Sequence, residues 1–209
     1  MTASQRQHPP LQQHQSPRNL EADYGSAGGG AERLLSDDSR KLLAAWKSWR
    51  GTRLLPHRRD MDLVSIARLM PRLAILEVFS PQRMIFRLAG TDIETFTGQR
   101  LSGRNHIALA EPDFRASRGE FLWAAATQPC GAVALHGFMH PESGQPHQTE
   151  SLALPILPDN AHDDPRAPIQ LICLASRLPM LETGQHVTAT LERVAATRHF
   201  IDIGAGIPA

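Results

Sequence analysis

The sequence contains little cysteine, which limits the cross-links and metal sites that it can form. Cys130 and Cys173 are the only cysteines among 209 residues. Two thiols are too few for a disulfide scaffold or for a four-cysteine zinc site. We therefore predict reduced thiols in the core of a cytoplasmic protein.

Long hydrophobic runs and aromatic residues are also scarce. No segment approaches the ~20 consecutive apolar residues that a membrane-spanning helix needs, and the polar N-terminus lacks the apolar stretch of a signal peptide. Aromatic residues make up 5% of the chain, whereas hydrophobic residues make up 41%. This composition predicts one core that is built mainly from aliphatic side chains.

Motifs of the common enzyme classes are missing. The sequence has no G-x-S-x-G, no phosphate-binding loop, no G-x-G-x-x-G after a strand and no H-E-x-x-H. His136, His140 and His147 lie close together, but their segment has the pattern of a strand and its hairpin loop, where a spacing of four does not stack side chains. We therefore predict no catalytic residue and no metal site, and a small metal-dependent enzyme is the weakest alternative.

The charges are unevenly distributed around a net charge of +1, which argues against a generally basic nucleic-acid-binding surface. Nine Lys or Arg residues lie between Arg40 and Arg72, where the acidic residues are Asp60 and Asp62. Such a run is a solvated surface or an interaction face. The segment Arg50–Arg59 therefore supports an alternative function, that of a regulator which binds nucleic acid or another anion.

The stretch Met84–Arg104 carries the clearest local pattern. Alternation over residues 84–88 predicts a strand, and the change of period that follows predicts a short helix that Gly98 closes. The strand, the helix and the next glycine turn would gather five apolar side chains around one volume: Phe86, Leu88, Ile93, Phe96 and Leu101.

A helix over Arg40–Arg50 precedes this stretch, with Asp37, Asp38 or Ser39 as its N-cap. Its apolar stripe carries Leu42, Trp46 and Trp49. Such a stripe either docks on its own domain or forms a contact between two subunits, where tryptophan is favoured. We predict that these three residues form a homodimer interface.

The remaining pattern predicts an α+β domain with a five-stranded antiparallel sheet and helices on one face. A second helix is expected from Asp60 or Asp62 to Met70, and a long helix over 111–128. The predicted strands cover 73–79, 84–88, 132–139, 148–157 and 169–175. Residues 1–36 form a disordered tail in this prediction, 37–180 the domain, and 181–209 a C-terminal amphipathic helix and tail.

The run FRLAGTDIETFTG, followed by LSGR, resembles the pattern of an alphaproteobacterial-type PAS domain family. The resemblance extends to RLLPHRRDMD at 53–62, to Leu69-Met70-Pro71 and to Leu154–Leu157, and covers roughly 41–179. Thr97 departs from it, because the family more often has a bulky aromatic residue before the glycine. The resemblance implies a sensory or protein-interaction module of bacterial signal transduction, without catalysis, whose N-terminal helix pairs in a homodimer.

In this fold the apolar side chains either pack on each other or line a pocket for a small apolar ligand. The predicted pocket residues come from the stretch Met84–Arg104 and from the later helix and strands: Phe86, Leu88, Thr91, Ile93, Phe96, Arg104, Phe121, Leu154 and Ile172. Thr149 is a further polar candidate. Arg104 would pair with a ligand carboxylate or bond within the chain.

The sequence does not identify a cofactor. The resemblance implies that a haem-binding relative takes its axial histidine from or near the long helix, where His106 is the nearest candidate. It also implies that a flavin photosensor needs a cysteine after the short helix, where Gly103–His106 contains none. We therefore expect neither haem nor flavin-adduct chemistry. A protein signalling partner is compatible with this reading, whereas a membrane or nucleic-acid partner is not expected.

Overall fold

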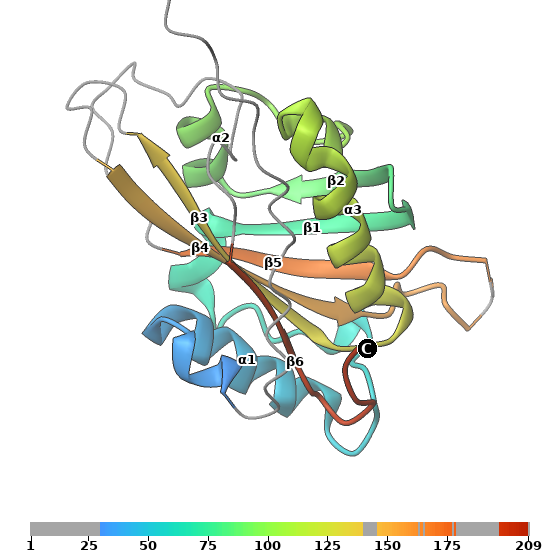
Figure 1. The fold of residues 1–209 in the computed structure, drawn as a ribbon. Helices are drawn as coiled ribbons and strands as arrows, with labels where there is room; N and C mark the ends of the chain where they lie inside the picture. The colour runs from blue at the N-terminus through green and yellow to red at the C-terminus, as the bar shows by residue number, and fades with distance from the viewer. Residues whose placement is uncertain are drawn as a thin grey trace, which may run out of the picture.

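A computed structural model describes residues 30–139, 146–162, 164, 166–176, 178 and 197–208. These residues form one six-stranded antiparallel sheet with helices on both faces, in the strand order β2-β1-β5-β4-β3-β6 (Figure 1). The strands are β1 Leu73–Ser80, β2 Arg83–Ala89, β3 Gly131–Met139, β4 Pro146–Ile156, β5 Gln170–Ser176 and β6 Thr197–Ile201. The α-helices are α1 Asp37–Arg50, α2 Thr91–Thr97 and α3 Pro112–Thr127, and shorter 3₁₀ helices cover Ala31–Leu34, Arg58–Asp60, Ala67–Arg72 and Ile107–Leu109.

The α+β class and the antiparallel sheet agree with the sequence prediction, whereas the strand count was one too low. The sixth strand, β6, pairs with β3 from Gly131↔Ile201 to Leu135↔Thr197. The C-terminal helix expected from residue 181 rested on Val187, Leu191 and Val194, which lie outside the described residues. Strand β6 has five residues. A strand of this length is too short for its alternation to be recognised in the sequence.

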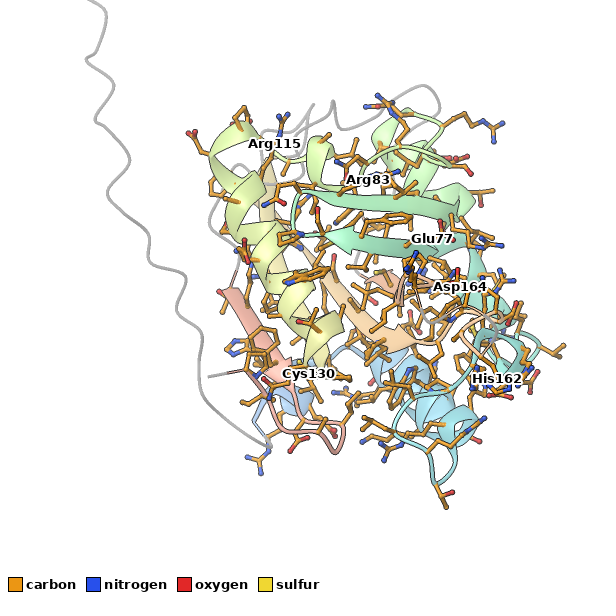
Figure 2. All side chains as sticks on the ribbon, turned by 90° about the vertical axis from the view of Figure 1, so that its right-hand side faces the viewer. Glu77, Arg83, Arg115, Cys130, His162 and Asp164 are labelled. Atoms are coloured by element: carbon orange, nitrogen blue, oxygen red, sulfur yellow. The ribbon has the colours of Figure 1, made fainter. Side chains whose placement is uncertain are left out.

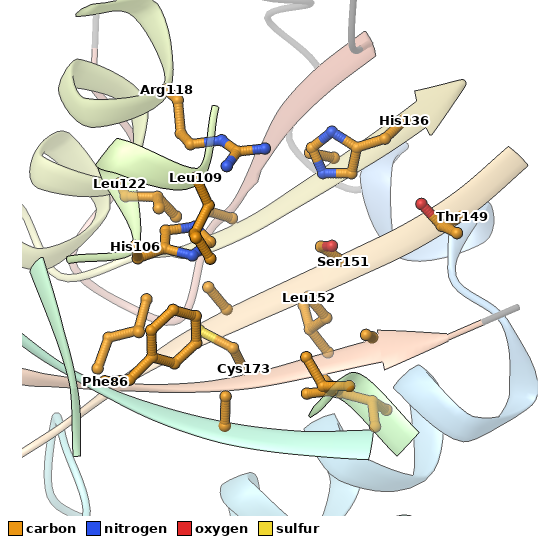
Figure 3. A pocket seen from close by; sticks show the side chains of 18 of the residues that line it. Phe86, His106, Leu109, Arg118, Leu122, His136, Thr149, Ser151, Leu152 and Cys173 are labelled. Atoms are coloured by element: carbon orange, nitrogen blue, oxygen red, sulfur yellow. The ribbon is translucent and has the colours of Figure 1, made fainter. Parts of the chain in front are cut away.

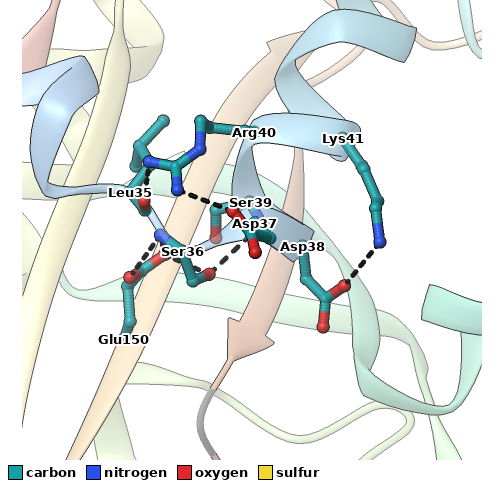
Figure 4. Close-up of polar contacts among 8 residues, drawn as sticks. All are labelled: Leu35, Ser36, Asp37, Asp38, Ser39, Arg40, Lys41 and Glu150. Atoms are coloured by element: carbon teal, nitrogen blue, oxygen red, sulfur yellow. Dashed lines mark hydrogen bonds and ion pairs between the residues drawn. The ribbon is translucent and has the colours of Figure 1, made fainter.

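The N-cap of helix α1 lies one residue before the predicted candidates, and the helix begins at Asp37. Ser36 is the N-cap, and its hydroxyl accepts a hydrogen bond from the Ser39 N–H at 3.3 Å. The fully buried Glu150 of β4 accepts two further bonds, from the Ser36 N–H at 2.9 Å and from the Ser36 hydroxyl at 3.0 Å (Figure 4). The start of the helix is therefore anchored to a central strand by a carboxylate that is distant in sequence, which local cap patterns do not show.

The apolar stripe of α1 lies in the core of its own chain. Leu42 and Trp46 are fully buried and Trp49 is 8% exposed. The Trp46 Nε1–H donates to the Pro155 carbonyl of β4 at 2.9 Å. Of the two alternatives for this stripe, the structure shows docking on the domain, and the predicted homodimer contact through these three side chains is wrong. Two tryptophans bury enough area to fix the helix on the sheet without a second subunit.

The predicted boundary between tail and domain at residue 36 also differs from the structure. Residues 30–36 were assigned to a disordered tail, yet Ala31–Leu34 form a 3₁₀ helix, and Ala31 and Leu35 are buried against the α1 face of the sheet. Residues 1–29 lie outside the described part. Ala31 and Leu35 do not repeat with a helical or strand period, so the sequence did not indicate this contact.

The helix predicted from Asp60 or Asp62 to Met70 is not a continuous α-helix. The segment contains two 3₁₀ helices, Arg58–Asp60 and Ala67–Arg72. The Asp62 carboxylate accepts from the Val64 N–H at 3.0 Å and so stabilises a turn between them. A side chain that bonds the backbone two residues later offers an alternative to the helix.

The second face of the sheet is covered by α2 and α3 (Figure 1). The sequence predicted helices on one face only, whereas α1 covers the opposite face through its apolar stripe. Gly98 ends α2 in the left-handed conformation, with φ 63°, which glycine adopts without steric cost. Gly119 lies in the middle of α3, where an added Cβ would come within 1.9 Å of the Pro81 carbonyl oxygen in the β1–β2 turn. The two backbones therefore touch at this position. None of the described helices is long and apolar enough to span a membrane.

Candidate functional site

A cavity of about 120 Å³ lies between the sheet and helices α2 and α3 (Figure 3). Its floor is a row of small side chains that crosses four neighbouring strands. Ala132 of β3 pairs with Ala153 of β4, Ala153 with Cys173 of β5, and Cys173 with Ala74 of β1. Larger side chains at these four positions would fill the space, so the row leaves the cavity open.

The walls are mainly apolar and come from strands and helices on both sides of the cavity. They include Phe86 of β2, Ile93 and Phe96 of α2, and Phe121 and Leu122 of α3. The Phe86 ring meets the His106 ring edge to face, with centroids 5.2 Å apart. Aromatic pairs of this geometry are favourable beyond their buried area and hold ring orientation.

One end of the cavity is polar. Arg118 of α3 and His136 of β3 extend toward one another, and the Thr149 and Ser151 hydroxyls of β4 lie beside them (Figure 3). Arg198 of β6 also lines the cavity, and its guanidinium carbon is 5.6 Å from the centre of the Phe121 ring. The arrangement therefore offers donor groups at one end and a hydrocarbon surface at the other.

The two thiols are not nucleophiles at neutral pH. Cys173 lies on the cavity floor, and burial raises its pKa to about 12. Cys130 follows α3 (Figure 2), and burial, with a smaller contribution from the Asp202 charge, raises its pKa to about 12. Because the thiolate is the reactive form, both side chains are protonated and unreactive near pH 7.

Four of the nine predicted pocket residues line this cavity: Phe86, Ile93, Phe96 and Phe121. Thr91 and Arg104 are exposed, and the Arg104 guanidinium donates to the Gln99 side chain. Of the two alternatives for Arg104, the structure therefore shows a bond within the chain and not a position in the cavity. Thr149, the further polar candidate, does line the cavity.

Leu154, Ile172 and Leu88 lie on the opposite face of the sheet. Leu154 directly follows the floor residue Ala153, and Ile172 directly precedes Cys173. Because successive side chains of a strand alternate between its faces, both point toward α1. Leu88 is displaced by a β-bulge, because Leu76 pairs with Phe86 while its neighbour Ile75 pairs with Leu88, which leaves Arg87 as the extra residue. A bulge of one residue moves the following side chain to the other face.

The cavity residues that sequence reasoning missed include the small floor residues and the buried arginines. No floor residue stands out in the sequence of its own strand. The four residues form a row only because the register of the four strands aligns them. Arg118 and Arg198 are each 4% exposed, which is unusual for arginine. Helix α3 was recognised by its apolar residues, so Arg118 was not considered as a cavity residue. Arg198 was not considered because strand β6 was not predicted.

The basic segment Arg50–Arg59 is largely engaged within the chain. Three of its four arginines bind other parts of the protein: Arg50 the Ile203 carbonyl, Arg53 the Asp60 carboxylate and Arg58 the Asp159 carboxylate. Pairs of this kind reduce the positive charge that the segment presents to an outside anion.

Of the three histidines that were considered for a metal site, His136 has a described side chain. His136 lines the cavity, whereas His140 and the His147 side chain lie outside the described residues. In the part of the chain that the structure describes, no three His, Cys, Asp or Glu side chains are placed to hold a metal ion.

A family model described as PAS domain matches residues 35–167, from the N-cap region of α1 to the loop after β4. This match overlaps the stretch in which the sequence resemblance was recognised. No curated protein and no solved structure matches the chain significantly. The family match covers well over half of the 209 residues, and the order of strands and helices agrees with it. The chain belongs to the PAS domain family.

Proposed function

We propose that this protein is a non-catalytic sensory module that binds a small molecule in the cavity between its sheet and helices α2 and α3. PAS domains are in general sensory and signalling modules without catalytic activity, and the chain belongs to that family. The observation that carries the proposal is the row of small side chains, Ala132, Ala153, Cys173 and Ala74, beneath the aromatic walls.

The energetic cost of the cavity supports occupation by a ligand. An empty core cavity costs about 24 cal/mol per Å³, so a volume of about 120 Å³ corresponds to roughly 3 kcal/mol. That is a large part of the 5–15 kcal/mol that typically separates folded from unfolded states. A ligand that fills the space restores the lost contacts, and folding stability then reports its concentration.

The proposal extends to bacterial signal transduction through a protein partner, since the module has no reaction of its own in this reading. A homodimer remains a prediction, but its contact must be built from residues other than the buried stripe of α1. The basic segment gives no comparable support for nucleic-acid binding, because three of its arginines are engaged within the chain.

Native mass spectrometry of the full chain tests the proposal, together with a variant that fills the cavity. Ala134 of β3 lines the cavity, and Ala134→Leu adds three carbon atoms to it. We expect the wild type to retain a bound small molecule or to take one up from a metabolite extract. We expect Ala134→Leu to lose that binding, whereas Ala44→Leu on the exposed side of α1 keeps it.

Binding that is equal in all three proteins would place the ligand elsewhere and overturn the proposal. A wild type that neither retains nor takes up a ligand from the extract would overturn it as well. Circular dichroism of each variant confirms that the sheet and the helices are intact, so that a loss of binding is attributed to the filled cavity.

A further inference from the structure

We infer that the cavity selects a compact organic anion: a monocarboxylate whose apolar body has about four to six carbon atoms. This inference rests on the proposed function, because it names the ligand class of the same cavity. The polar end would hold the carboxylate, and the aromatic walls and the small floor residues would hold the apolar body.

Two buried arginines give the polar end its charge. Arg118 from α3 and Arg198 from β6 reach the cavity from different elements, and each is 4% exposed. Arginine stays protonated in proteins, so both positions carry a positive charge at every physiological pH. Charged groups in a low-dielectric site interact strongly with an opposite charge that shares it.

Among the described residues, the side chains around the two arginines add polar groups and no negative charge. The Thr149 and Ser151 hydroxyls and the His136 ring lie at the same end as Arg118 (Figure 3). No Asp or Glu is among the described residues that line the cavity. Glu150 lies between the two hydroxyl residues on β4, but its carboxylate binds Ser36 on the opposite face of the sheet. The electrostatic field inside the cavity therefore favours an anion.

The chemistry of the guanidinium group allows a ligand alongside contacts within the protein. Each guanidinium carries five N–H donors in a fixed plane, so it can bind an internal partner through one edge and a carboxylate through another. The inference therefore does not require that either arginine lack partners in the chain.

The volume sets the size of the apolar body. An engineered core cavity of about 150 Å³ holds benzene, which has six carbon atoms. The present cavity, at about 120 Å³, holds a body of similar or slightly smaller size. Haem and flavin rings are several times larger, so the volume favours a small acid over either cofactor.

The test compares isovalerate with isovaleramide, which has the same number of non-hydrogen atoms but no charge. Titration of the full chain, followed by two-dimensional NMR, gives both affinities and the resonances that move. We expect isovalerate to bind at least tenfold more tightly than isovaleramide and to shift the resonances of Thr149 and Ser151. The comparison uses the wild type alone, so it does not depend on the folding of any variant.

Variants then locate the charge that is responsible. Arg118→Met and Arg198→Met should each reduce the isovalerate preference at least fivefold and leave isovaleramide binding nearly unchanged. Arg68→Met, at an exposed arginine of the 3₁₀ helix Ala67–Arg72, should have no effect.

The outcomes separate this inference from the proposed function. Equal binding of the two probes would overturn the anion preference and leave the cavity as a binding site. A preference that survives in both cavity variants but disappears in Arg68→Met would place the anion on the surface and overturn the inference. If neither probe binds and Ala134→Leu does not alter uptake from an extract, the proposed function fails together with it.

Discussion

The two faces of the sheet are packed in different ways, although one set of strands supplies both. The face toward α1 is filled beneath that helix with large side chains, among them the fully buried Trp46, Leu154 and Ile156. A more open hollow, lined by Leu73, Leu88 and Ile172, lies beside this packed region on the same face. The face toward α3 has alanines and a cysteine at its centre and leaves a cavity. The buried charged groups differ too. The cavity face carries Arg118 and Arg198, whereas the α1 face carries the Glu150 carboxylate.

This difference suggests that one face of the sheet mainly stabilises the fold and that the other face is available for binding. Dense packing of large side chains gives most of the free energy that holds a core together. A cavity gives up part of that free energy and is compatible with folding only when the rest of the core compensates. We infer that the α1 face stabilises the fold and that the α3 face can therefore be adapted to a ligand. The following predictions test that division.

The largest expected effect is on the α1 face. Trp46→Ala removes a fully buried indole and leaves the Pro155 carbonyl without its donor, and should lower the free energy of unfolding by about 3–5 kcal/mol. Trp123→Ala, at a partly buried tryptophan on α3, should cost less than half as much. Urea denaturation measures both. Similar losses in the two variants would remove the proposed division of the faces.

The next effect is expected where α3 meets the β1–β2 turn. Alanine at position 119 would place its Cβ 1.9 Å from the Pro81 carbonyl oxygen, so Gly119→Ala should destabilise the protein by about 1–3 kcal/mol. In a helix with free space, the same change would stabilise by up to about 1 kcal/mol. The sign of the change in melting temperature therefore decides whether the two backbones touch.

A matched pair of substitutions compares the two faces directly. Ala31→Leu introduces three carbon atoms into the packed α1 face and should cost about 1–3 kcal/mol. Ala134→Leu introduces the same atoms into the cavity and should change the free energy of unfolding by less than about 1 kcal/mol. Thermal denaturation of both variants checks this. A larger loss for Ala134→Leu would mean that the cavity face has no space to spare.

The smallest effect concerns pH. The Cys130 pKa is raised from its ordinary value of 9.0 to about 12 in the folded chain, so between these values the unfolded chain loses a proton that the folded chain keeps. Stability from this group is complete below pH 9 and is lost as pH rises toward 12, by about 1 kcal/mol at pH 10. Denaturation of wild type and Cys130→Ala at pH 7, 9 and 10 should show a steeper decline in the wild type. Parallel declines would assign the alkaline sensitivity to other groups.

Elements with a strong local pattern were predictable from the sequence. The hairpin β1–β2, helix α2 with its Gly98 end, and helix α3 all lie within a few residues of their predicted bounds. Each depends on a period or a turn residue that neighbouring positions carry together. The same reasoning placed Phe86, Ile93, Phe96 and Phe121 around one volume, which the structure shows to be the cavity.

The faces of the central strands were not predictable in this way. Residues 152–156 of β4 are all buried, so alternation does not tell Ala153 from Leu154. The bulge at Arg87 depends on the register between β1 and β2, and the short strand β6 depends on β3, a partner that is distant in the sequence. The row of small floor residues and the pair Arg118 and Arg198 follow from register between strands, which a single sequence does not contain.

The Glu150 contact gives the cavity a mechanical connection to the N-terminal end of the domain. Thr149, Glu150 and Ser151 are consecutive on β4, so a shift of the strand that follows from filling the cavity also moves the carboxylate that holds Ser36. That serine is the N-cap of helix α1, and the 3₁₀ helix Ala31–Leu34 that precedes it packs on the same face of the sheet. We expect the Ser36 amide resonance to move during the isovalerate titration, and an unchanged resonance would rule out this route. The strand would then transmit ligand binding to the N-terminal end of the described chain.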